Sequence, residues 1–67
     1  MAIKDRRLAV MLGGKAWHAT YDVTADAIVK VSSAYGSDQE PLAMDDETIP
    51  EQAERMFRAI LARYAAR

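Results

Sequence analysis

The carboxyl-terminal part of the chain carries its most regular pattern of hydrophobic and polar positions. Apolar side chains recur there at spacings of three and four residues: Ala53, Met56, Phe57, Ile60, Leu61 and Tyr64. This spacing places all of them on one side of an α-helix. We therefore predict an amphipathic helix over residues 49–66, whose apolar stripe packs against the rest of the chain.

The start of this helix has its own signature. Residues 48–51 match a capping box, in which Thr48 accepts a hydrogen bond from the backbone of Glu51 and the Glu51 carboxylate accepts one from the backbone of Thr48. Pro50 falls in the first turn, where a missing N–H costs no helical hydrogen bond.

The residues before the helix alternate with a period of two. Over residues 15–23 the odd positions, such as Trp17 and Tyr21, are mostly apolar, which predicts a half-buried strand. Gly13-Gly14 favours a tight turn, so we predict a preceding strand over residues 7–12. The same glycines are compatible with the end of a short helix over residues 3–12.

Two further strands are predicted downstream. Residues 27–35 are rich in β-branched side chains, although Ile28 and Ala34 make the second face of this strand partly apolar. A turn is expected at residues 36–38. Residues 39–43 are expected to form at most an edge strand, since Pro41 cannot donate to a sheet.

Together these elements predict a single α+β domain over residues 1–67. It is an antiparallel meander of three or four strands with the amphipathic helix packed on one face. The first strand presents either Leu8 and Val10 or Ala9 and Met11 inward. With the first choice, the expected core is Leu8, Val10, Leu12, Trp17, Tyr21, Val23, Val29, Val31, Met56, Phe57, Ile60, Leu61 and Tyr64.

Size and composition favour self-association. A chain of 67 residues buries only about 60% of its surface, and domains of this size are often stabilised by a disulfide, a metal or a second subunit. The chain has no cysteine and one histidine, yet 51% of its residues are hydrophobic. We expect a homo-oligomer, most simply a two-fold dimer, with no cofactor.

Neither a membrane segment nor a targeting segment is predicted. No run approaches the roughly 20 apolar residues that span a bilayer. The apolar stretch 8–12, which follows several basic residues, is too short for the core of a signal peptide. The default prediction is a cytoplasmic protein.

Charge is segregated along the chain. Residues 1–37 carry five basic and three acidic side chains, residues 38–51 six acidic and no basic ones, and residues 52–67 four basic and one acidic. The candidate contacts for a partner or a nucleic acid are Arg6, Arg7, Arg55, Arg58 and Arg63. Against nucleic-acid binding, the sequence pI is about 5.7 and two helical arginines have glutamates at i,i+4 spacing.

Other candidate chemistry has a simpler interpretation. His18 has Asp22 about 13 Å further along the same strand face, too far to form a catalytic pair. The acidic residues 38–47 lack the spacing of a calcium loop and are interpreted as a solvated connection. Ala59, Ala62 and Ala66 could form a helix–helix seam, but helix propensity alone explains them.

Residues 19–23 and 29–37, followed by Pro50-Glu51, resemble short uncharacterised bacterial proteins. In those proteins a strand meander ending in Tyr-Gly-Ser precedes a helix that starts with Pro-Glu. The resemblance implies no activity, substrate or site. From the residues themselves we expect a non-enzymatic interaction module that self-associates through its outer sheet face or its helix. The alternative is a small nucleic-acid-binding accessory protein that uses the helix arginines and the basic N-terminal arm.

Overall fold

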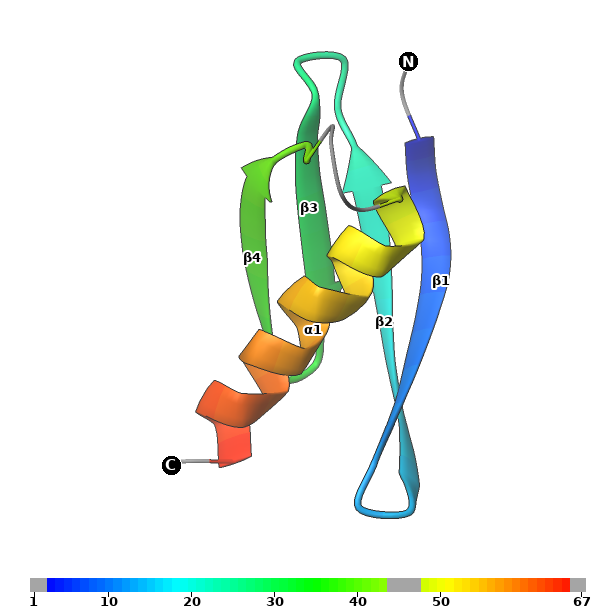
Figure 1. Cartoon of the computed structure of the whole chain (residues 1–67), viewed down its shortest axis with the longest axis vertical. Helices are drawn as coiled ribbons and strands as arrows, with labels where there is room; N and C mark the ends of the chain where they lie inside the picture. The colour runs from blue at the N-terminus through cyan, green and yellow to red at the C-terminus, as the bar shows by residue number, and fades with distance from the viewer. Residues whose placement is uncertain (1–2, 44–47, 66–67) are drawn as a thin grey trace.

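The computed structural model describes residues 3–43 and 48–65, which form one sheet and one helix (Figure 1). The elements are β1 (Ile3–Leu12), β2 (Lys15–Val23), β3 (Ile28–Ser33), β4 (Gly36–Pro41) and α1 (Ile49–Ala65). The strands are antiparallel neighbours in the order β1-β2-β3-β4, and α1 crosses one face of the sheet diagonally. The predicted α+β meander with a carboxyl-terminal helix is confirmed.

The first hairpin is longer than its hydrophobic pattern indicated. Gly13 and Gly14 have φ values of 60° and 76°, the left-handed pair that a tight two-residue turn requires. Residues 3–12 are therefore a strand, and the helical alternative is wrong. The strand begins at Ile3 rather than at residue 7, because a bulge lets the polar residues continue the ladder. Asp5 has a φ of 53°, and its N–H donates to Asp22 Oδ1 at 2.7 Å.

The turn between β3 and β4 comes earlier than predicted. β3 ends at Ser33 and β4 begins at Gly36, so the predicted turn at 36–38 was wrong. The edge strand predicted at 39–43 is present, but it runs from Gly36 to Pro41. The Ser33 hydroxyl donates to the Gly36 carbonyl at 2.8 Å and accepts from the Tyr35 N–H at 3.2 Å. A side chain thus closes this turn, which period-two alternation could not reveal.

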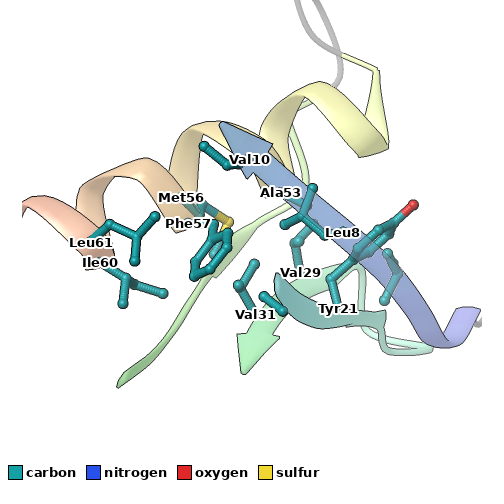
Figure 2. Close-up of a cluster of buried hydrophobic side chains, with 12 residues drawn as sticks. Leu8, Val10, Tyr21, Val29, Val31, Ala53, Met56, Phe57, Ile60 and Leu61 are labelled. Atoms are coloured by element: carbon teal, nitrogen blue, oxygen red, sulfur yellow. The ribbon is translucent and has the colours of Figure 1, made fainter. Parts of the chain in front are cut away.

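The core lies between α1 and the face of the sheet that it covers (Figure 2). The buried hydrophobic residues are Leu8, Val10, Ala19, Tyr21, Val23, Val29, Val31, Ala53, Met56, Phe57, Ile60 and Leu61. Leu8 and Val10 point inward, which settles the choice left open for the first strand. Leu12 and Tyr64 were wrongly placed in the core, since they are 38% and 45% exposed, and Trp17 is only half-buried.

Leu12 is exposed because the first hairpin extends past the rest of the sheet (Figure 1). β2 pairs with β3 only from Thr20 to Val23, so the end of the hairpin has no third strand beside it. The hydrophobic pattern alone does not show where a neighbouring strand stops.

The start of α1 confirms the capping box. The Thr48 N–H donates to Glu51 Oε1 at 2.8 Å, and the Glu51 N–H donates to Thr48 Oγ1 at 3.3 Å. Hydrogen bonding to Thr48 lowers the pKa of the Glu51 carboxyl, the backbone N–H of Thr48 having the larger effect and its side chain the smaller. The structure places the end of α1 at Ala65, and position 66 of the predicted helix lies outside the described residues.

Candidate interaction surface

The three helical arginines among the candidate contacts lie on α1, and each pairs with a carboxylate. Arg58 binds Glu54 at 3.0 Å, the i,i+4 pair expected from the sequence. The other two reach across to β4: Arg55 binds Glu40, and Arg63 lies 3.4 Å from Asp38. Arg55 and Arg63 therefore link the helix to the sheet, whereas the Arg58 pair lies within the helix.

The Glu40 carboxylate accepts hydrogen bonds from two side chains of α1. It accepts hydrogen bonds from Arg55 and, at 2.8 Å, from the side-chain amide of Gln52. The bond from Arg55 is the main reason why the pKa of Glu40 is lowered, and the bond from Gln52 adds to it against the opposing effect of burial. Glu40 thus stays ionised at neutral pH in a structural contact.

The other two candidate arginines are on β1 and point to different faces. Arg6 lies opposite Tyr21, on the face that α1 covers, and Arg7 lies opposite Thr20 on the open face. Both are exposed, and neither has an ion-pair partner within residues 3–43 and 48–65. The five candidate arginines therefore do not form one continuous surface.

The open face of the sheet is flat and made mostly of small or polar side chains. Antiparallel pairing aligns Arg7, Thr20, Ser32 and Ser37 in a row across all four strands. A shallow depression of about 350 Å³ on this face is lined by Arg7, Leu8, His18, Ala19, Thr20 and Ser32. The aromatic residues Trp17 and Tyr21 of β2 point to the other face, so neither of them is available to stack on a base at the open face.

His18 and the acidic residues are not assembled into a reactive group in the described part of the chain. His18 is exposed on the open face opposite Ala9. Asp45, Asp46 and Glu47 lie outside the described residues. Among residues 3–43 and 48–65, no group of three or more metal-ligating side chains comes together, and no helix is long and apolar enough to cross a bilayer.

An aromatic cluster marks the end of the molecule where the first hairpin projects. The Trp17 and Tyr35 ring centroids are 5.0 Å apart and those of Tyr35 and Tyr64 5.1 Å apart, both edge-to-face. Trp17 Nε1 donates to the Leu12 carbonyl at 3.2 Å, and Lys15 Nζ lies 4.4 Å from the Trp17 ring centroid. Sequence reasoning missed this cluster because it put Tyr35 in a strand rather than in the turn.

At the same end of the molecule, but on the open face of the sheet, lies the most exposed large hydrophobic side chain of the described residues. Met11, at the end of β1, is 62% exposed and points to the open face, while neighbouring Leu12 is 38% exposed. Within the described part of the chain, β1 has a strand neighbour on one side only. The segment Leu8–Leu12 is thus an uncharged sheet edge, and two of its own apolar side chains, Met11 and Leu12, are exposed.

The two halves of β1 differ in how this edge is protected. The first half carries four charged residues in a row, 4–7, and the bulge at Asp5. Charges and bulges are the common means by which proteins prevent a sheet edge from pairing with another chain. Residues 8–12 contain no charge, no proline and no bulge, so this half of the edge lacks those means.

Comparisons with protein-family models, with curated protein sequences and with solved structures found no match to this chain. The resemblance to short bacterial proteins therefore stays an interpretation of the sequence.

Proposed function

We propose that the protein is a small non-enzymatic interaction module that self-associates as a homodimer, with residues 8–12 of β1 at the centre of the contact. The observation that carries this proposal is the exposure of Met11 beside an uncharged, unpaired strand edge. Backbone groups at such an edge are donors and acceptors ready to bind another strand.

The composition of the surrounding surface supports a contact role. Aromatic residues and methionine are enriched at protein interfaces, and methionine adapts its shape to the partner. Met11, Leu12 and Tyr64 are the exposed large hydrophobic residues of the described chain, and half-buried Trp17 and Tyr35 contact one another and Tyr64. The small size of the core gives a second subunit a stabilising role as well.

The non-enzymatic part of the proposal rests on how the titratable side chains are used. Asp38, Glu40 and Glu54 are engaged by arginines that stabilise the packing of α1 or its outer face. His18 is exposed on the open face, opposite Ala9 and at the shallow depression. A general base needs a group that orients it and a substrate proton within reach, and the register of the sheet supplies no such partner to His18.

Nucleic-acid binding is the second candidate function, favoured by the unpaired Arg7 beside the depression on the open face. The three helical arginines are held by carboxylates, so only Arg6 and Arg7 of the proposed contacts are available. This function predicts an affinity for oligonucleotides that falls steeply with salt and is reduced by Arg7→Ala. Unchanged fluorescence anisotropy of labelled DNA and RNA at low salt would exclude it.

Light scattering coupled to size exclusion tests the proposed self-association. Met11→Lys places a charge in the centre of the proposed contact, whereas Ala62→Lys places the same charge on the exposed side of α1. Met11→Lys is expected to raise the dimer dissociation constant about tenfold or more, because a buried methionine contributes about 1.5–3 kcal/mol. Ala62→Lys is expected to leave it unchanged. Equal dimerisation of the two variants would place the contact elsewhere.

A further inference from the structure

We infer that the second copy pairs with this one edge to edge through β1, antiparallel, about a two-fold axis at Val10. The result is one continuous eight-stranded sheet with both helices on the same face. This inference rests on the proposed self-association and names its partner, its edge and its register.

The choice of edge follows from comparing the two outer strands. β4 is short and contains Pro41, which has no N–H to donate, and its acidic residues Asp38 and Glu40 bind arginines of α1. Figure 1 shows the carboxyl-terminal half of α1 lying towards β4 and away from the lower part of β1. The segment Leu8–Leu12 is thus the less protected of the two edges.

The direction of the backbone groups limits the register. The two-residue turn is closed by the pair Leu12 and Lys15, and such a closing pair is hydrogen-bonded. Because backbone groups alternate sides along a strand, Leu8 and Val10 also face β2. The N–H and C=O groups of Arg7, Ala9 and Met11 therefore point to the free edge.

A two-fold axis at Val10 uses these groups fully. Ala9 lies opposite the partner's Met11, and Met11 opposite the partner's Ala9, so each pair exchanges two backbone hydrogen bonds. Val10 lies opposite the partner's Val10 as a non-hydrogen-bonded pair. After a shift of one residue, each residue whose backbone groups point to the free edge would lie opposite a residue whose groups point to β2. The backbone hydrogen bonds between the two copies would then be lost.

The side chains favour the same register over a shift of two residues. Directly opposite residues in a sheet share a face, so Met11 packs beside the partner's Ala9 and Leu12 beside the partner's Leu8. Both exposed large hydrophobic side chains of the segment gain an apolar neighbour from the partner in this way. A shift of two residues in one direction brings Arg7 opposite the partner's Met11, and a shift in the other direction runs Ala9 into the partner's Gly13 turn.

The size of the contact sets its expected strength. Five residues per copy bury less than the roughly 800 Å² per partner of a standard interface. We therefore expect a reversible dimer whose population depends on concentration rather than an obligate one.

Disulfide trapping tests the register, because the native chain has no cysteine. Ala9→Cys and Met11→Cys are exposed positions on the same face. In the inferred dimer, position 9 lies about 5.5 Å from the partner's position 11 between Cα atoms, within the range of a disulfide. Two copies of position 9 are offset by two residues along the strands, about 8 Å apart and beyond that range.

Mixing the two variants under mild oxidation should therefore give mainly the mixed disulfide, at least tenfold over either homodisulfide, as read by intact mass. Ala62→Cys, on the exposed side of α1, is the control and should not cross-link preferentially. Prevalent Ala9→Cys or Met11→Cys homodisulfides would show a shifted register and overturn the inference. If the wild-type chain dimerises but no disulfide forms preferentially, the edge-to-edge geometry is overturned and the proposed self-association stands. A wild-type monomer at all concentrations would overturn the proposed self-association and, with it, this geometry.

Discussion

The side-chain amide of Gln52, on the first turns of α1, donates to the carboxylate of Glu40 on β4 at 2.8 Å. The same amide nitrogen donates to the Pro41 carbonyl at 2.8 Å, and the amide oxygen accepts from the Ala43 N–H at 2.7 Å. Gln52 is fully buried, yet every buried side-chain polar atom in the described residues has a partner. One polar side chain therefore ties the helix to the end of the sheet.

Replacing Gln52 by an apolar residue should lower the free energy of unfolding, although an apolar side chain normally suits a buried site. Gln52→Leu keeps the volume but leaves the half-buried Ala43 N–H without its partner, which costs about 1 kcal/mol, the lower end of the range for a buried donor. Gln39→Leu, on an exposed position of β4, is the matched control and should change little. The measurement is the free energy of unfolding in urea. Equal stability of the two variants would mean that the hydrogen bonds of Gln52 contribute no net stability.

Acid should destabilise the fold through Glu40. Its pKa in the folded state lies below the ordinary value of 4.5, chiefly because of the hydrogen bond from Arg55. A lowered folded-state pKa contributes stability that is present above the unfolded-state pKa and is lost as the pH falls through the folded-state value. The folded-state pKa of Glu51 is also lowered, because its carboxylate accepts hydrogen bonds from Thr48.

We therefore expect the urea midpoint to be steady around neutral pH and to fall below pH 4.5. Glu40→Gln should lower the midpoint at neutral pH and reduce the loss on acidification. Asp26→Asn, at an exposed turn position, is the control. An acid dependence of Glu40→Gln as steep as that of the wild type would assign the effect to other carboxylates.

In the turn between β2 and β3, replacing one residue by glycine should increase the stability of the protein. Ala27 has a φ of 61°, and its N–H donates to the Thr24 carbonyl at 3.0 Å. An L-residue pays about 1–2 kcal/mol in this conformation, which glycine adopts freely, while glycine adds unfolded-state entropy of about 0.4–1 kcal/mol. Ala27→Gly should therefore stabilise the protein by about 0.5–1 kcal/mol. Ala25→Gly, which relieves no positive φ, should not, and a destabilised Ala27→Gly would contradict the account.

The elements that were predictable from sequence are those specified by local patterns. The helix follows from the spacing of Met56, Phe57 and Ile60 together with the capping box at its start, and the first hairpin from Gly13-Gly14. Each of these signals lies within a few residues and needs no knowledge of the rest of the fold.

The features that escaped prediction depend on contacts between distant residues. Arg63 meets Asp38 across 25 positions, and Gln52 is buried only because Glu40, 12 positions earlier, receives its amide. The location of Gln52, four residues before Met56 on the apolar stripe, is a signal that could have identified it as buried. Self-association stays a prediction from composition, and the position of the exposed apolar edge was not predictable, because Leu12 is exposed only where β3 ends.

The most direct test of edge pairing is the concentration dependence of amide hydrogen exchange at Ala9 and Met11, followed by NMR. Their N–H groups point to the free edge of β1, whereas Ser37 offers the same kind of group on the free edge of β4. We expect exchange at Ala9 and Met11 to slow as the protein is concentrated, while exchange at Ser37 stays constant. Exchange at Ala9 and Met11 that is fast and independent of concentration would contradict edge pairing.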